Sequence, residues 1–233
     1  SDVYKRQELT VPWRRHSGGD TDNLISSWHR FFGLPDGNRD SYPTDALHYQ
    51  LSQPEHDRHL LRSVSGLGDI HVAVSRPLLA IDGGQLGISA GVKTASGQAS
   101  DWLGSGATDI YALLRFSGQQ LGGWPLWWHG QVGGTRAGDS DLLGPRQRRS
   151  LWFAGLAAEW RFMPRWSALM QYDGHSALLD GALEALDEPA GMLSMAVRWR
   201  PTAHWMIDAG FSEDVVVESA PDITFLLNAR YVP

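Results

Sequence analysis

Apolar and polar positions alternate from Gly68 to Lys93, in two runs separated by the glycine-rich sequence Asp82-Gly83-Gly84. Aliphatic residues recur at every second position in most of each run, and the residues between them are small, polar or charged. A period of two that is closed by a tight turn is typical of a β-hairpin. The stretch therefore predicts two paired strands with one aliphatic face and one polar face.

The same alternation recurs along most of the chain and predicts an all-β fold of about 11 strands. A strand at 8–15 and a hairpin within 45–61 precede the stretch described above, and the remaining strands follow it. After Gly68, short turns alternate with long polar loops. The short turns are 81–85, 117–123, 163–165 and 201–203, and the long loops are 94–108, 133–150, 174–190 and 213–221.

Charges of both signs on the polar faces favour a transmembrane antiparallel meander β-barrel, with apolar faces toward lipid and polar faces toward a lumen. Short turns would then lie on the periplasmic side and long loops outside the cell. A strand of about ten residues, tilted by about 40°, spans roughly the 25 Å height of such a barrel. A soluble β-sandwich or lipocalin-like barrel explains the alternation equally well, but it explains the loop asymmetry and the inward charges poorly.

Tryptophan is abundant, at 11 of 233 residues, and many tryptophans fall near the ends of predicted strands. This position is typical of an aromatic girdle at a membrane surface. The tryptophans concerned are Trp13, Trp124, Trp152, Trp160, Trp166, Trp199 and Trp205.

Composition excludes several classes of protein. The formal net charge of −6 argues against a nucleic-acid partner, and the absence of cysteine excludes disulfides and thiolate sites. No apolar run approaches 18 residues, so no transmembrane helix is predicted.

Residues 1–7 have no strand pattern and are interpreted as a non-native or disordered leader, followed by a single barrel domain at 8–233. We expect this domain to be truncated at its N-terminus, with an even total of about 12 to 14 strands in the full protein.

A long polar segment at 17–44 interrupts the strand pattern and predicts a short helix that begins near Asp22 and stops at Gly33. Its apolar residues include Trp28, Phe31 and Phe32. A loop of this length in a compact domain is usually functional. The sequence leaves open whether it folds inward as a plug or outward as a lid.

Strand parity assigns a mixed set of acids and bases to the predicted lumen. Either these charges pair into a network that fills a narrow barrel, or they line a pore and set its selectivity. The predicted lumen-lining residues are Asp69, His71, Lys93, Asp109, Arg115, His129, Glu159, Arg161, Asp173, Arg198, Arg200, Asp208 and Arg230.

No motif for nucleophilic or metal-assisted catalysis stands out, so we assign no catalytic residue, no metal site and no cofactor. His56 and His59 are three residues apart, which places them on opposite faces of a strand. An outer-membrane hydrolase remains an alternative, because barrel enzymes assemble their sites from separate strands. Its inward candidates are His71 and His129, with Ser89 or Ser194 and Asp109 or Asp173.

Several long motifs resemble a bacterial outer-membrane family catalogued as domain of unknown function 3187. The motifs are VPWRRHSGG at 11–19, WHRFFGLPDGNRD at 28–40, GLGDIHVAV at 66–74, GVKTASG at 91–97, LGSGATD at 103–109 and SEDVVVESAPDITF at 212–225. The chain departs from the family at 94–97, where members usually read Pro-Thr-Gly, and at its non-aromatic end, Val232-Pro233.

The resemblance implies a β-barrel in the outer membrane of Gram-negative bacteria, made with a signal peptide, and no assigned activity. The partners implied are outer-membrane lipid, lipopolysaccharide and the barrel-assembly machinery. We therefore expect a small-solute channel or a structural component of the envelope.

Overall fold

The structure is a computed structural model that describes residues 5–35, 37, 41–53, 55–81, 83–181, 184–216 and 223–232. Residues 1–4 of the predicted leader and Asp82 of the predicted hairpin turn lie outside the described residues.

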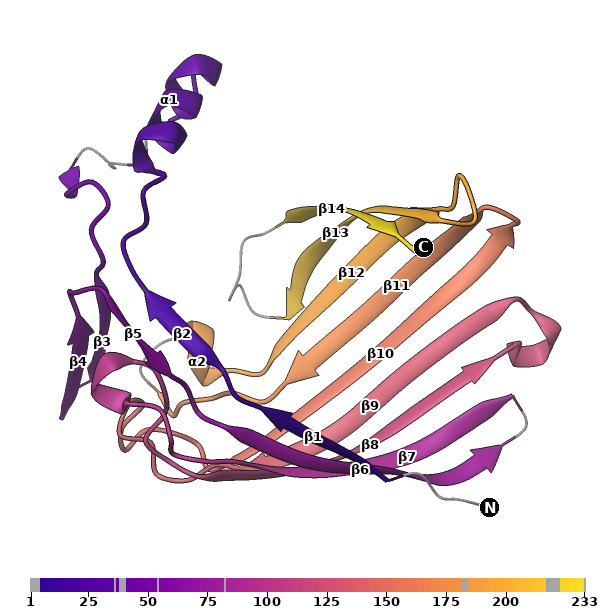
Figure 1. The fold of residues 1–233 in the computed structure, drawn as a ribbon, viewed down its shortest axis with the longest axis horizontal. Helices are drawn as coiled ribbons and strands as arrows, with labels where there is room; N and C mark the ends of the chain where they lie inside the picture. Colours follow the sequence, from indigo (N-terminus) through magenta and orange to yellow (C-terminus); the bar gives the residue numbers. More distant parts are fainter. Residues whose placement is uncertain are drawn as a thin grey trace.

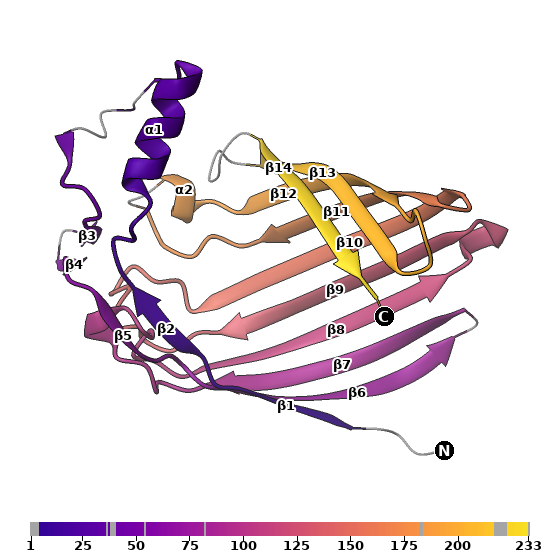
Figure 2. The same cartoon turned by 45° about the horizontal axis from the view of Figure 1, so that its top comes forward.

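A ten-stranded antiparallel sheet forms most of the molecule, and Figures 1 and 2 show it bent into a trough with β1 and β14 at its two edges. The strands follow the order β1-β6-β7-β8-β9-β10-β11-β12-β13-β14, so the prediction of an all-β antiparallel meander is confirmed. Their bounds are β1 (Arg6–Thr10), β6 (His71–Ile81), β7 (Gly84–Lys93), β8 (Asp109–Gln119), β9 (Leu126–Arg136), β10 (Ser150–Met163), β11 (Trp166–His175), β12 (Ala190–Trp199), β13 (Trp205–Val216) and β14 (Thr224–Tyr231).

The two ends of this sheet differ in the length of their connections, as the sequence predicts. Short connections join β6 to β7, β8 to β9, β10 to β11 and β12 to β13, and we call this the turn end. Long connections join β7 to β8, β9 to β10 and β11 to β12 at the opposite, loop end (Figure 1). Two short 3₁₀ segments, η2 (Ala99–Asp101) and η3 (Leu121–Gly123), and the short helix α2 (Glu184–Asp187) lie in these connections.

Two small sheets lie beyond the loop end. One pairs β2 (Trp13–His16) with β5 (Val64–Leu67), and the other pairs β3 (Tyr49–Gln53) with β4 (His56–Leu60). The described residues thus hold 14 strands rather than about 11. Proline has no backbone N–H, so the strand predicted at 8–15 divides at Pro12 into β1 and β2, and β5 has no clear alternation that would have revealed it.

Helix α1 (Asp22–Phe32) confirms the predicted helix, and Gly33 ends it with a φ of +65°. In both views it projects away from the sheet beyond the loop end (Figures 1 and 2). The backbone N–H of Asp45 donates to Asp22 Oδ2 at 2.8 Å, while the side chains of Trp28 and Phe31 on the apolar side are exposed. Among the described helices, none is long and apolar enough to cross a membrane.

Buried apolar side chains gather at the loop end rather than beneath the large sheet. A buried cluster of Leu47, Leu60, Val64 and Leu103 packs against Trp102 there. On the apolar face of the sheet, by contrast, the large apolar side chains are exposed. Leu156 on β10 and Met170 on β11, for example, are 53% and 52% exposed. Within the described residues, the sheet therefore carries its apolar side chains outward.

Candidate functional site

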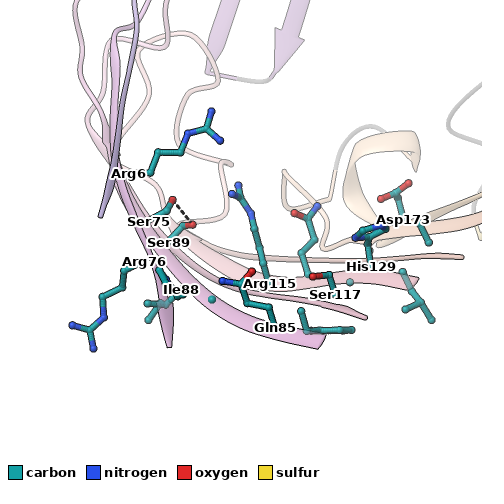
Figure 3. A pocket seen from close by; sticks show the side chains of 18 of the residues that line it. Arg6, Ser75, Arg76, Gln85, Ile88, Ser89, Arg115, Ser117, His129 and Asp173 are labelled. Atoms are coloured by element: carbon teal, nitrogen blue, oxygen red, sulfur yellow. Dashed lines mark hydrogen bonds between the residues drawn. The ribbon is translucent and has the colours of Figure 1, made fainter. Parts of the chain in front are cut away.

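The predicted polar residues that belong to strands of the large sheet share one of its faces, because directly paired residues project to the same side. Asp69 precedes β6, and Arg200 follows β12. His71 pairs with Lys93, and Lys93 pairs with Asp109. Farther along the strands, pairings place Arg115 and Asp173 in one row across β8 to β11, through Gln131 and Gly155. We call this the polar face. It is the concave side of the trough, as the close-up in Figure 3 shows for Arg115, His129 and Asp173.

A buried cation with two carboxylates stands where the polar face meets the loop end. Lys93 Nζ lies 3.2 Å from Asp69 Oδ2 and 2.9 Å from Asp109 Oδ2, and it also contacts the Ser105 hydroxyl. The Lys93 side chain is 13% exposed. We call Asp69, Lys93 and Asp109 the loop-end cluster. Its two ion pairs join the chain before β6, the end of β7 and the start of β8.

Backbone donors from the 94–108 loop surround the Asp69 carboxylate. Gly97 N–H donates to Oδ1 and Ser105 N–H donates to Oδ2, each at 2.9 Å. Burial raises the pKa of Asp69, but the donors of Ser105 and Gly97, together with Lys93, outweigh it, so that this pKa lies below its ordinary value. Asp109 also binds a loop through a backbone donor, since its Oδ1 accepts a hydrogen bond from Gly138 N–H at 3.0 Å. The loop-end cluster therefore fastens two loops to the sheet.

A second group of charges lies near the turn end and contains two arginines and two carboxylates. Arg198 makes a bidentate contact with Asp208, at 2.7 and 2.9 Å, and donates to Glu159 at 2.7 Å. Arg200 donates to the other Glu159 oxygen at 2.6 Å and to the Ser167 hydroxyl at 2.9 Å. We call Glu159, Arg198, Arg200 and Asp208 the turn-end cluster. It links β10 to β13 by side chains alone, and its formal charges cancel.

Between the two clusters the polar face forms a basin of about 540 Å³. Figure 3 shows Arg6, Arg115 and Asp173 pointing into it, whereas Arg76 turns away. The hydroxyls of Ser75 and Ser89 are hydrogen-bonded to each other at 2.7 Å on one wall. Its other polar lining residues are Gln85, Ser117, His129, Gln131 and Gln171.

The sequence of the chain matches one known protein family. The family model described as a protein of unknown function, DUF3187, matches residues 5–232. The chain belongs to this family. The match spans the motifs that carry the resemblance, so membership of DUF3187 is confirmed, and the family description assigns no activity. A search of curated proteins found no match to the chain.

Three of the predicted residues of this DUF3187 chain are members of neither cluster and do not line the basin. Arg161 stacks on Trp127, with its guanidinium carbon 4.7 Å from the ring centroid. His71 on β6 pairs with Thr10 on β1 and with Lys93 on β7. Arg230 is on the edge strand β14, where it lies opposite Met206 of β13.

The side chains considered for a hydrolase are not joined to one another in the described structure. Ser89 bonds to Ser75, and Asp109 bonds to Lys93, while the rings of His71 and His129 make no hydrogen bond with a described residue. Among the described residues, no group of three or more histidine, aspartate and glutamate side chains could hold a metal ion.

Two residues that line the basin or contact the loop-end cluster were not predicted from the sequence. Arg6 points into the basin, although RQELT was too short to show alternation and its first two residues were assigned to the leader. Ser105 lies in a loop of small residues, where nothing in the sequence marks it as a partner of Lys93 and Asp69.

Proposed function

We propose that the chain is an outer-membrane β-barrel of Gram-negative bacteria that serves as a channel for small polar solutes. The observation that carries this proposal is the inverted distribution of side chains, with apolar residues exposed across the sheet and charged residues on its concave face. Monomeric soluble proteins rarely expose apolar patches larger than a few hundred Å². Lipid is the surrounding in which such a surface is stable.

The aromatic residues at the turn end support this orientation. Trp166 and Trp199 stack with ring centroids 5.7 Å apart, and Trp205 contacts Tyr231 at 5.3 Å. A band of tryptophan and tyrosine at one end of the strands is typical of a membrane interface. In our proposal this band faces the periplasm, and the long loops face lipopolysaccharide.

The edges of the sheet are compatible with closure into a barrel. Backbone polar groups in lipid need internal partners, so β1 and β14 require strands at their open edges. Nine antiparallel pairings join the ten strands, which makes β1 and β14 antiparallel to each other. The two edges can therefore pair directly, or through an even number of added strands, as the even-number rule for such barrels requires.

The lining supports conduction of small solutes rather than of large ones. A barrel of ten strands lies between the side-chain-filled eight-stranded barrels and the open porins. Ion pairs occupy both ends of the polar face, and the basin between them is the size of a small-molecule site. The competing proposal is a barrel that does not conduct and has a structural role in the envelope.

Two neighbouring lysine substitutions test the membrane orientation. Met170 lies on the apolar face of β11 and is 52% exposed, whereas Gln171 lies on the polar face and donates to Asp173 at 2.6 Å. In a lipid-facing sheet, Met170→Lys should cost about 2–4 kcal/mol of folding free energy in bilayers. Gln171→Lys should cost much less, because the introduced ammonium group can pair with Asp173. Equal costs, or full solubility of the unmodified chain without detergent, would remove the membrane proposal.

Planar-bilayer recording tests conduction. The full chain should insert and give discrete conductance steps above the lipid background. Stable insertion without any step would reject the channel and favour the structural role.

A further inference from the structure

Arg115 stands out among the residues that line the basin because its charge is not matched. Arg161 and Arg230 also lie on the polar face without an ion pair to a described residue, but neither lines the basin. The guanidinium of Arg115 makes no hydrogen bond or ion pair with the described residues, although every arginine and lysine of the two clusters is paired. Arg6, the other cation that points into the basin, lies 3.9 Å from Glu8. The contact of Arg6 with Glu8 is long and exposed, whereas Arg115 has no partner at all among the described residues, so its guanidinium is free to bind a ligand.

The neighbours of Arg115 leave room for such a ligand. Gly87 is its partner on β7, so no side chain stands beside the arginine on that strand. On β9 its partner is Gln131, whose own partner on β10 is Gly155. The next row across the strands places Ser117, His129 and Gln171 along the floor. These side chains supply hydrogen-bond donors without adding a carboxylate.

Asp173 is the one carboxylate among the described residues that line the basin. It lies three strands from Arg115 in the same row, which corresponds to about 14 Å along the sheet. It also accepts a hydrogen bond from Gln171 Nε2 at 2.6 Å. No ion pair or hydrogen bond joins Asp173 to Arg115 in the described structure, so this carboxylate does not pair with the guanidinium.

We infer that the basin is an anion site, in which Arg115 binds the oxyanion of a small solute such as a carboxylate or a phosphate monoester. A guanidinium matches two oxygens of either group with parallel hydrogen bonds. The volume of about 540 Å³ suits a small polar molecule. The inference rests on the proposed channel, because it names the solute that this lumen selects.

Ion selectivity in planar bilayers tests the inference with a matched control. Arg115→Gln removes the free charge, and Arg115→Lys retains it. Arg76→Gln makes the same change on the neighbouring surface, where the side chain turns away from the basin (Figure 3). In a KCl gradient the unmodified chain should show a reversal potential on the anion-selective side. Arg115→Gln should move that potential toward zero or to the cation side, and Arg115→Lys and Arg76→Gln should keep its sign.

Calorimetric titration with inorganic phosphate in detergent separates this site from the channel itself. Phosphate affinity should fall about tenfold or more in Arg115→Gln and stay unchanged in Arg76→Gln. Phosphate binding that depends on Arg115, without conductance, would reject the channel and retain the site. A conducting but cation-selective chain, or phosphate binding indifferent to Arg115→Gln, would overturn the anion site and leave the channel proposal standing.

Discussion

The loop-end and turn-end clusters place similar charges on the same face of the sheet, but their partners differ. At the loop end, one lysine serves two carboxylates, and backbone N–H groups of Gly97 and Ser105 complete the coordination of Asp69. At the turn end, two arginines and two carboxylates satisfy each other through their side chains. One cluster depends on a single cation and on the fold of a loop, whereas the other distributes its contacts over neighbouring strands.

This difference shows what each cluster does for the fold. The loop-end cluster connects the sheet to segments that have no strand partner of their own. The turn-end cluster adds contacts between strands that the backbone already pairs, since Arg198 lies directly opposite Asp208. Loss of a charge should therefore have a larger effect at the loop end, where no second cation contacts the carboxylates among the described residues.

The largest effect is expected for Lys93→Met. Asp69 is only 3% exposed, and this substitution leaves its carboxylate and that of Asp109 without a cation. We expect a loss of about 3–5 kcal/mol in the free energy of unfolding, measured by urea titration in detergent micelles. Lys93→Arg is the control and should lose less, because the positive charge remains. A small loss in Lys93→Met would mean that the backbone donors alone hold the cluster.

A smaller effect is expected for Arg198→Met. Glu159 keeps Arg200, and Asp208 keeps its hydrogen bond to Asn228. We expect a loss of about 1–3 kcal/mol in the same urea titration. The double variant Arg198→Met, Asp208→Asn should recover part of this loss, because no uncompensated carboxylate remains. If Arg198→Met were as damaging as Lys93→Met, the contrast between the clusters would be wrong.

The smallest effect is expected from acid, and Asp69 at the loop end gives it a local readout. The pKa of Asp69 is lowered in the folded chain, so its contribution to stability is fully present above the ordinary pKa of about 3.9. That contribution is lost as the pH falls through the lower, folded pKa. The protection of the Gly97 and Ser105 amides from hydrogen exchange, relative to the intrinsic exchange rate at each pH, should fall over this range. Asp69→Asn should abolish the pH step, and an unchanged step would assign it to another group.

Strand parity predicts a face for a charged residue within a regular strand. A period of two fixes the side of a strand without knowledge of its neighbours, so Lys93, Glu159 and Arg198 could all be assigned to one face. Which of them meet could not be predicted, because contact depends on register across several strands. Arg198 and Glu159, for example, are 39 residues apart and lie on strands that are not adjacent.

The N-terminal region was predicted less completely for a different reason. Helix α1 was found because Asp22 and Gly33 mark its ends. The β3–β4 sheet corresponds to the hairpin predicted within 45–61. The β2–β5 sheet was not predicted, because its strands pair across a long stretch of chain and neither shows a long alternation. The free charge of Arg115 was likewise hidden, since a sequence shows the residue but not the absence of a partner.

The buried cluster of Leu47, Leu60, Val64 and Leu103 has a consequence for the order of folding. Three of its members lie close together in sequence, and Leu103 comes from the loop that Asp69 fastens. The chain between Val64 and Leu103 contains the β6–β7 hairpin, and pairing of that hairpin shortens the effective loop that must be closed. Assembly at this end should be sequential, with hairpin formation first, docking of the loop next and closure of the apolar cluster last.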